Sequence, residues 1–482
     1  MKKKKRGARS TEQGAKPPAA RPERGRKAES NGPAGQTTGR VFPGILSARA
    51  LAITTLARVE ATQAYLNVVL DAALDENPLA DPRDAGLVTE VCYGATRRRL
   101  LLDAAILQVA DRKLDALEDK VLAALRIGAY QLFFTRVPKH AAVADTVEAL
   151  KQVGLDRAAG FVNAILRRIS EMPAPPSAAP GDFSAKLALE HSHPQWLVKR
   201  WLRHFGADRT VEMLAADNSA PSVVVRVNAS KTTRAELLTL WDESGIEATP
   251  TTVSPQGLVL ESPGRVDHLL GYSEGLFAVQ DEAAQLVGLY AAVPAGAKVL
   301  DVCAAPGGKA LHLAETNTVV ACDLHANKLR LIQAEAARLG LEANITTRAC
   351  DASKPLPEDL GEFDVVMVDA PCSGLGTLRR HPELRYRRKE EDIAALAKLQ
   401  RSIIENAQVL VKPGGLLVYA VCSPEPQEGA DQAELFLRSH PDFTAEPPSL
   451  GYAVPDDQGH LRTLPGKEGM DGFFAARLRR MY

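Results

Sequence analysis

The sequence lacks several features that would point to a secreted, membrane or metal-dependent protein. Its 482 residues include six cysteines, but none of them forms a C-x-x-C pair or a zinc-ligand spacing. No apolar run approaches the roughly 20 residues that a membrane-spanning helix needs, and no apolar segment follows the charged N-terminus as in a secretory signal. We therefore expect a cytoplasmic protein with reduced cysteines, no bound metal and no membrane association.

Net charge is also absent, but the charges are unevenly distributed. Lysine and arginine together number 59, as do aspartate and glutamate. The first 40 residues carry twelve basic and three acidic side chains. Because large apolar residues are almost missing there, residues 1–45 are predicted to be a disordered basic tail. Such a tail is suited to contact a polyanion, although a solvated tail without a partner has the same composition.

Hydrophobic periodicity divides the remainder of the chain. Apolar residues three and four positions apart, as in Leu51, Ala52 and Leu56, predict helices that pack on one face. No alternating pattern interrupts them before the proline-rich stretch that begins after residue 170. The predicted segments are an all-helical domain (46–170), a semi-rigid linker (171–182), a helical and small α+β module (183–290) and a final domain (291–482).

Strands alternate with helices in the final domain, which predicts a parallel, doubly wound, Rossmann-like α/β sheet. The expected strands are Val299–Val302, Thr318–Cys322, Asn344–Thr347, Asp364–Val368, Leu416–Tyr419 and Gly472–Leu478. The expected helices are Lys309–Glu315, Ala326–Leu339 and Ile393–Leu410. Lys412–Gly415 is expected to be a turn that ends the last of these helices.

A glycine-containing loop follows the first of these strands. Its spacing is neither G-x-G-x-x-G nor G-x-x-x-x-G-K-[ST], which disfavours a dinucleotide or P-loop phosphate site. Acids at the ends of the next strands could bind ribose hydroxyls and an adenine amino group, although each could equally cap a helix or turn. The combination favours S-adenosylmethionine. The candidate cofactor-binding residues are Cys303, Ala304, Ala305, Pro306, Gly307, Gly308, Lys309, Asp323, Asp351 and Asp369, and Lys309 is expected to pair with a nearby acid such as Asp369.

Two further strand ends each carry a cysteine. Cys372 follows Asp369-Ala-Pro, and Cys422 follows the next strand. Open α/β sheets bind ligands at the carboxyl ends of their strands. Two thiols beside an aspartate suit chemistry at carbon 5 of a pyrimidine, because a thiolate that adds to carbon 6 makes carbon 5 nucleophilic. A single cysteine is more often a small buried hydrophobe, and that is the expectation for Cys92, Cys322 and Cys350.

Together these segments resemble the RNA cytosine-C5 methyltransferase family of the RsmB/Fmu type. The resemblance covers about residues 46–480, and its helical part looks like a NusB-like domain through Arg126–Gln131, His140–Val143 and Gly160–Arg167. It implies a class I methyltransferase sheet and methylation of cytosine 967 of 16S ribosomal RNA, with S-adenosylmethionine and no metal, by a monomer. Two residues depart from the family pattern. The family commonly has threonine at the position of Val421, and threonine or serine at the position of Ala310.

The resemblance also implies a role for each site residue. Cys422 would be the nucleophile, Cys372 would assist proton removal and release, and Asp369 would bind the base edge. The residue types alone leave open which thiol attacks. The expected RNA contacts are Arg379 and Arg380, in a basic loop that continues to Lys389, together with Arg226 and Asn228.

Three other functions fit parts of the sequence. The enzyme could act on transfer RNA or another RNA, or the chain could be a NusB-like RNA-binding protein with an inactive methyltransferase domain. The presence of Asp369, Cys372 and Cys422 argues against inactivity. Protein methylation is disfavoured because it has no need for two thiols.

Overall fold

The computed structural model describes residues 46–482, apart from residues 80, 179–180, 262, 450–455 and 467–468. The basic tail predicted for residues 1–45 lies outside the described residues. None of the described helices is both long enough and apolar enough to cross a membrane.

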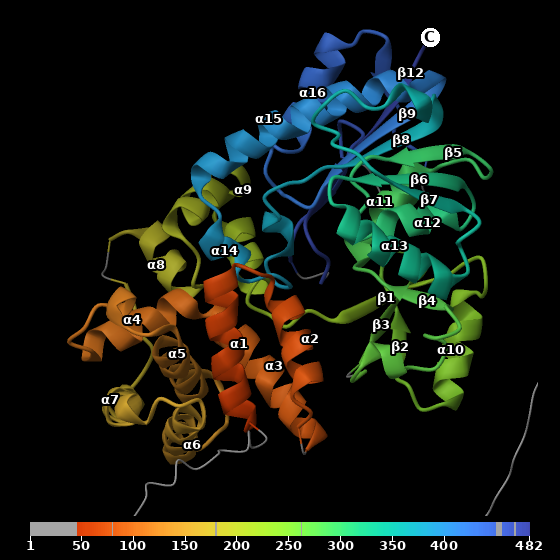
Figure 1. The fold of residues 1–482 in the computed structure, drawn as a ribbon. Coiled ribbons are helices and arrows are strands. Elements are labelled where there is room, and N and C mark those ends of the chain that lie inside the picture. Colours follow the sequence, from red (N-terminus) through yellow and green to blue (C-terminus); the bar gives the residue numbers. More distant parts are fainter. Residues whose placement is uncertain (1–45, 80, 179–180, 262, 450–455, 467–468) are drawn as a thin grey trace, which may run out of the picture. The chain divides into compact units, whose positions relative to one another are not determined.

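The first described region is helical, as predicted (Figure 1). Its first helix, α1, begins where the Ser47 hydroxyl accepts a hydrogen bond from the Ala50 backbone N–H at 3.3 Å. Helix α1 is buried along most of its length and packs against α3, α5 and α6, so it forms the centre of the bundle. The helices are α1 (Ala48–Thr62), α2 (Leu66–Glu76), α3 (Pro82–Arg97), α4 (Arg99–Val109), α5 (Asp119–Phe134), α6 (Lys139–Gln152) and α7 (Asp156–Ser170), with a short 3₁₀ turn at Leu114–Ala116.

A smaller module follows and is also of the predicted type. Two helices lead into a four-stranded antiparallel sheet of order β2-β3-β1-β4. Helix α10 starts with a capping box in which Thr233 and Glu236 bond each other's backbone N–H. The elements are α8 (Phe183–Glu190), α9 (Gln195–Ala216), β1 (Val223–Val227), α10 (Arg234–Glu243), β2 (Ala248–Pro250), β3 (Gly257–Leu260), a 3₁₀ turn (Val266–His268) and β4 (Phe277–Val279).

The last region contains the large sheet, in the order β10-β12-β9-β8-β5-β6-β7, with β11 paired to β12. Strands β5 to β9 are parallel, and β12 closes the sheet antiparallel to β9. The elements are α11 (Glu282–Ala291), β5 (Lys298–Asp301), α12 (Gly308–Ala314), β6 (Thr318–Asp323), α13 (Ala326–Leu339), β7 (Ile345–Ala349), β8 (Phe363–Asp369), α14 (Leu384–Arg387), α15 (Glu390–Ala407), β9 (Val411–Val421), α16 (Ala430–Ser439), β10 (Phe443–Ala445), β11 (Leu461–Thr463) and β12 (Phe473–Arg480).

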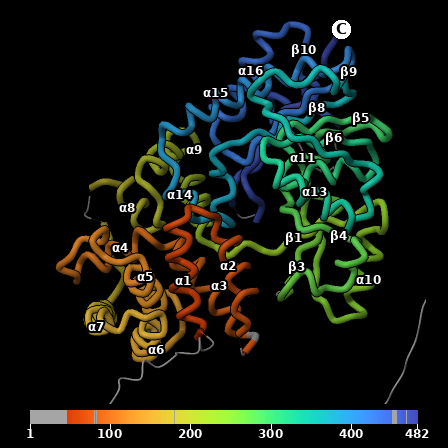
Figure 2. Tube along the Cα trace, viewed as in Figure 1, coloured from red at the N-terminus to blue at the C-terminus, as the bar shows by residue number. Residues whose placement is uncertain are grey.

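Helices cover both faces of this sheet because its strands are apolar on both faces (Figures 1 and 2). On β8, Val365 and Met367 pack in the layer formed with α11, α12 and α13. Val366 and Val368 point the other way and pack in the layer formed with α15 and α16. This alternation is what a doubly wound parallel sheet requires, and the predicted fold class is confirmed.

One local expectation was wrong. Lys412–Gly415 was expected to be a turn after the long helix, but it lies inside β9. The helix ends earlier, at Ala407, and a 3₁₀ turn follows. The ladder with β8 pairs Phe363 with Val411 and then shifts register before Leu416, so these residues form an irregularity in the strand. Gly414 takes a φ of 73° there, which favours glycine.

Candidate active site at the carboxyl edge of the sheet

The two thiols predicted to act together lie in contact. Strands β8 and β9 are parallel neighbours, with Asp369 opposite Ala420 at the end of the ladder. The loops that follow therefore start at the same level of the sheet. The Sγ atoms of Cys372 and Cys422 are 3.1 Å apart, and both are free thiols.

Cys372 has a perturbed thiol. The hydrogen bond with Cys422, together with burial, raises the pKa of the Cys372 thiol well above its ordinary value. Cys372 therefore holds its proton and can donate it toward the Cys422 sulfur. The thiolate is the reactive form of cysteine.

Asp369, three residues before Cys372, forms a partly buried ion pair. The Lys309 ammonium, at the start of α12, lies 2.7 Å from an Asp369 carboxylate oxygen. Burial opposes the charge on Lys309, but the Asp369 carboxylate outweighs it, so the pKa of Lys309 is raised. The Lys309 nitrogen also lies 4.8 Å from the centre of the Phe473 ring. The pair expected from the sequence is thus present, and it fixes the carboxylate of Asp369.

The glycine loop is shaped by a close approach of backbone and side chains. Gly307 has a φ of 116°, and a Cβ at this position would lie 3.1 Å from Ile332 and 3.3 Å from Leu311. Ala304 is buried, and its N–H bonds the Cys322 carbonyl oxygen at 2.8 Å. Together these contacts place the loop from Cys303 to Lys309 against the ends of β5 and β6.

Two carboxylates lie at or just after the ends of strands at the carboxyl edge of the sheet, and hydrogen bonds orient both. Asp323 accepts from the N–H of Ala305 at 3.2 Å and of His325 at 2.9 Å. Asp351 accepts from the Ser353 N–H at 3.1 Å and pairs with Lys354 at 2.9 Å. Carboxylates at successive strand ends beside a glycine turn can accept hydrogen bonds from ribose hydroxyls and an amino group. This set of acceptors fits a nucleoside-bearing methyl donor.

The expected RNA contacts at Arg226 and Asn228 need correction. The Arg226 side chain is 1% exposed, forms an ion pair with Glu315 and donates to Gln280 at 2.6 Å. Asn228 is also 1% exposed and donates to the carbonyl oxygens of Gly275 and Leu339. Neither side chain has surface with which to meet RNA in this structure. Both instead link the small module to the large sheet.

The basic loop after Cys372 needs the same correction. Arg379 is buried and donates to the Gly469 carbonyl oxygen. Arg380 forms ion pairs with Asp281 at 2.7 Å and Asp471 at 2.9 Å. In this structure Arg379 and Arg380 therefore bond groups of the protein itself, and the charge of Arg380 is paired with two acids.

Other arginines of this loop bind the helical region. Arg387 donates to the carbonyl oxygens of Gln63 at 2.7 Å and Ala64 at 2.8 Å, after the end of α1. Arg385 is fully buried and bonds the Arg97 carbonyl oxygen at 3.4 Å. The loop thus joins the helical region to the strand ends that carry the thiols.

Two residues support the Cys372 loop in a way that the sequence did not predict: Arg388, which was counted only as part of the basic loop, and Gln400. Arg388 donates to the carbonyl oxygens of Ser373 at 2.9 Å and Cys372 at 3.3 Å. Gln400, from α15, donates to the Pro371 carbonyl oxygen at 3.0 Å. Their sequence separations from the loop carry no motif signal, so only the fold reveals them.

An aromatic side chain from the helical region was also missed. Tyr65, just before α2, is 45% exposed and lies edge-on to His381 with ring centres 5.0 Å apart. Burial and the thiols of Cys422 and Cys372 raise the pKa of Tyr65, although Arg388 opposes this. The helical region therefore contributes to the surroundings of the thiol pair.

The departures from the family pattern fall at core positions. Val421 is fully buried in the layer with α15 and α16, and its backbone pairs with Phe474 on β12. Ala310 is fully buried in the layer with α11 and α13. Both substitutions replace a polar hydroxyl by apolar atoms in an apolar environment, where an unpaired hydroxyl would be costly.

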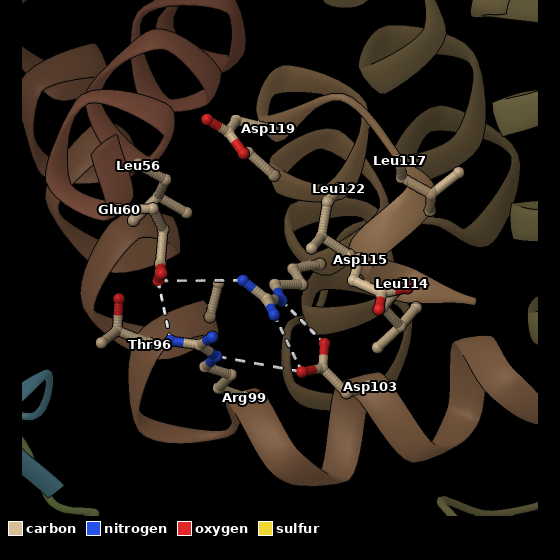
Figure 3. A pocket seen from close by; sticks show the side chains of 13 residues that line it. Leu56, Glu60, Thr96, Arg99, Asp103, Leu114, Asp115, Leu117, Asp119 and Leu122 are labelled. Carbon is tan, nitrogen blue, oxygen red and sulfur yellow. Dashed lines mark hydrogen bonds and ion pairs between the residues drawn. The ribbon is translucent and has the colours of Figure 1, made fainter. Parts of the chain in front are cut away.

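A separate cavity of about 370 Å³ lies in the helical region (Figure 3). Its charged side chains pair with one another: Arg126 with Asp103 at 2.7 Å, and Arg99 with Glu60 at 2.9 Å. None of the predicted site residues lines it. Within the described part of the chain, no cluster of three or more histidine, cysteine, aspartate or glutamate side chains could hold a metal ion.

The parallel sheet, the glycine turn and the acids at successive strand ends define the class of Rossmann-like methyltransferases. Models of known families sharpen this. The model described as 16S rRNA methyltransferase RsmB/F matches residues 291–479, and the NusB family model matches residues 46–171. A model of the ferredoxin-like domain of RsmF/B-like methyltransferases matches residues 193–267.

Relatives agree over nearly the whole chain. Ribosomal RNA small subunit methyltransferase B of Vibrio cholerae is 37% identical, covering 91% of this chain and 98% of that protein. A probable ribosomal RNA small subunit methyltransferase B of Bacillus subtilis is 36% identical, covering 90% and 99%. The chain therefore belongs to the 16S rRNA methyltransferase RsmB/F family.

Solved structures support the fold. The crystal structure of PH0851 superposes with a TM-score of 0.78 at 26% identity, covering 90% of this chain and 99% of that one. NSun6 from Pyrococcus horikoshii, solved with SFG, superposes with a TM-score of 0.55 at 21% identity, covering 60% and 98%. The second likeness concerns the fold alone.

Proposed function

We propose that this protein methylates carbon 5 of a cytosine in 16S ribosomal RNA, with cytosine 967 as the target and S-adenosylmethionine as the donor. Family membership and the names of the Vibrio cholerae and Bacillus subtilis relatives support the substrate. The observation that carries the reaction type is the contact of two thiols, 3.1 Å apart, next to Asp369. Methyl transfer to an oxygen or an exocyclic nitrogen needs no such pair.

In this proposal Cys422 is the nucleophile. Its sulfur forms a bond to carbon 6 of the cytosine, and the electron pair of the carbon 5–carbon 6 double bond becomes available at carbon 5. Cys372 supports this step because its raised pKa keeps it protonated and hydrogen-bonded to the Cys422 sulfur. The Asp369 carboxylate, held by Lys309, accepts a hydrogen bond from the exocyclic amine of the base.

The same groups complete the reaction. When bound, S-adenosylmethionine supplies the electrophilic methyl group that carbon 5 attacks. The carbon 5 proton then passes to water, assisted by the hydrogen-bonding Cys372 thiol. The electron pair of the broken carbon 5–hydrogen bond restores the double bond, and the Cys422 sulfur leaves carbon 6 as a thiolate. A base must leave its stack to reach this edge, as for other enzymes that act on nucleobases.

The donor would be held by the loop from Cys303 to Lys309 together with Asp323 and Asp351. The turn at Gly307, with a φ of 116° that favours glycine, and the adjoining Gly308 allow close backbone approach to a ligand. Asp323 suits ribose hydroxyls, and Asp351 suits an amino group. The cytoplasmic location and monomeric state predicted above remain predictions.

The test is a methylation assay on 16S ribosomal RNA and, in parallel, on transfer RNA, each lacking this modification, read by bisulfite sequencing. We expect one cytosine, number 967, to become protected only when protein and S-adenosylmethionine are both present. Protection on transfer RNA alone would favour the rival substrate. RNA binding without any protected cytosine would favour an inactive methyltransferase domain.

A further inference from the structure

A buried carboxylate connects the two loops that carry the thiols. Glu428 lies between β9 and α16 and has no exposed surface. One of its oxygens accepts from the Ser373 N–H at 2.8 Å and from Gln400 at 3.1 Å. The other accepts from the hydroxyls of Ser373 and Ser423, the latter at 2.6 Å. A single side chain thus bonds the residue that follows each reactive cysteine.

These contacts use the full capacity of the carboxylate. An ionised carboxylate is an acceptor only, with about four lone-pair sites, and four donors reach it here. The two serine hydroxyls are 3.1 Å apart, so the same oxygen draws both together. Gln400 extends the network, because its amide also bonds the Pro371 carbonyl oxygen next to Cys372.

The sheet alone does not fix the thiols. The ladder of β8 and β9 ends with Asp369 opposite Ala420, before either cysteine. Beyond it, the Gly376 N–H bonds the Cys422 carbonyl oxygen at 3.1 Å, which links the backbones. The bonds of Glu428 act one residue after each sulfur and therefore control where the two loops stand relative to each other.

We propose that Glu428 is a positioning residue that holds the Cys372 and Cys422 loops in register, so that the two sulfur atoms meet around one base. Its importance for methyl transfer rests on the proposed function, but its effect on the thiol geometry does not. A purely structural role would lower stability without changing how often the sulfurs meet.

The direct test measures how fast Cys372 and Cys422 form a disulfide with diamide, detected by peptide mass spectrometry. In this reaction both thiols lose their protons, and the two sulfurs give two electrons to the azo bond, which becomes a hydrazine. The rate reports how often the sulfurs approach, and it needs neither RNA nor methyl donor.

The variants are Glu428→Ala and Glu428→Gln, with Glu282→Ala as a matched control. Glu282 is also buried and accepts from the N–H groups of Val253 at 2.6 Å and Ser254 at 2.7 Å, but it is on neither loop. We expect disulfide formation to slow about tenfold or more in Glu428→Ala, since misplacement by about 1 Å can cost about 100-fold in a reaction. In Glu282→Ala the rate should stay within about twofold of the parent although the protein melts at lower temperature.

Glu428→Gln gives an intermediate result and covers the case in which the alanine variant does not fold. Its oxygen can replace the one that accepts from Ser373 and Gln400, but its amide cannot accept from the two hydroxyls. We expect disulfide formation to slow by about two- to fivefold. A rate equal to that of the parent in the folded Glu428 variants, or equal slowing in Glu282→Ala, overturns the proposal.

Methyl transfer supplies the second measurement. For Glu428→Ala we expect kcat to fall by about 100-fold, with the KM for RNA within about twofold because Glu428 cannot touch the substrate from its buried position. If the parent protein methylates no cytosine, the proposed function fails, and the disulfide rates still decide the role of Glu428.

Discussion

The carboxyl edge of the large sheet has two halves that are held in different ways. On the half formed by β6 and β7, Asp323 and Asp351 each accept a hydrogen bond from the N–H group two positions later in the chain, and the bond to Asp323 from the more distant Ala305 also comes from the backbone. On the half formed by β8 and β9, side chains from other elements hold the loops. Arg388 and Gln400 bond the carbonyl oxygens of Cys372 and Pro371, and Glu428 bonds the serine that follows each cysteine.

A substitution on the β6 and β7 half should therefore change function with little effect on stability, whereas a substitution on the β8 and β9 half should change both. An acid in a local turn can be removed with few consequences for the remaining fold. The thiol loops depend on buried charged groups that also connect the domains, so changes there affect both activity and folding. Variants on the two halves should therefore behave differently.

The largest effect is expected from Cys422→Ala. Loss of the attacking sulfur should lower kcat by about 10⁴-fold or more and abolish the covalent complex with RNA containing 5-fluorocytosine. Cys372→Ala should instead form the complex and accumulate it, since release is impaired. Denaturing gel electrophoresis measures the amount of covalent complex in each variant, and a methylation assay measures kcat. Cys92→Ala, which changes a buried cysteine of the helical core, is the control. Adducts formed by Cys422→Ala would reverse the assignment of the two thiols.

Arg380→Met tests the long-range half through stability. Removing the guanidinium leaves Asp281 and Asp471, both nearly buried, without their partner. We expect the free energy of unfolding to fall by about 3–5 kcal/mol, measured by urea denaturation. The slope of RNA affinity against salt concentration should stay unchanged, because the charge of Arg380 is paired with Asp281 and Asp471. A flatter slope with unchanged stability would restore the RNA contact inferred from the sequence.

Asp323→Ala tests the local half through binding. Hydrogen bonds to a charged group contribute about 1.5–3 kcal/mol, so the KM for S-adenosylmethionine should rise about 10- to 100-fold. Stability should change little, because Asp323 is partly exposed and bonds two backbone N–H groups but no charged side chain in the described part of the chain. Asp359→Ala, an exposed acid paired with Arg348, is the control. An unchanged KM in Asp323→Ala would exclude this carboxylate from the donor site.

The sequence predicted local features better than distant partners for the same reason. The strand ends, the glycine loop and the pair of Lys309 with Asp369 follow from patterns within a few residues or from the parallel sheet. The basic loop was interpreted as an RNA surface because the sequence shows the charges of Arg379 and Arg380 but not the acids and carbonyl oxygens that bond them. Glu428 carries no motif signal of its own, and its role is visible only when both loops are in place.

The smallest effect concerns Asp301, at the end of β5 where the local half begins. Burial, with Asp369 and Asp323 nearby, raises the pKa of Asp301 to about 7, well above the ordinary value of about 3.9. The folded protein then keeps a proton that the unfolded chain releases, so this contribution to stability is complete below about pH 4 and is lost as the pH rises through about 7. The asparagine of Asp301→Asn does not titrate. Other groups that titrate in this range, such as the buried Asp217, whose pKa is raised to about 7, contribute equally in the variant and the parent. The melting temperature of Asp301→Asn relative to the parent should therefore improve by a few degrees between about pH 5 and about pH 8. A difference that is constant with pH would mean that Asp301 is ionised in the folded protein, and that the local half carries one more negative charge than proposed.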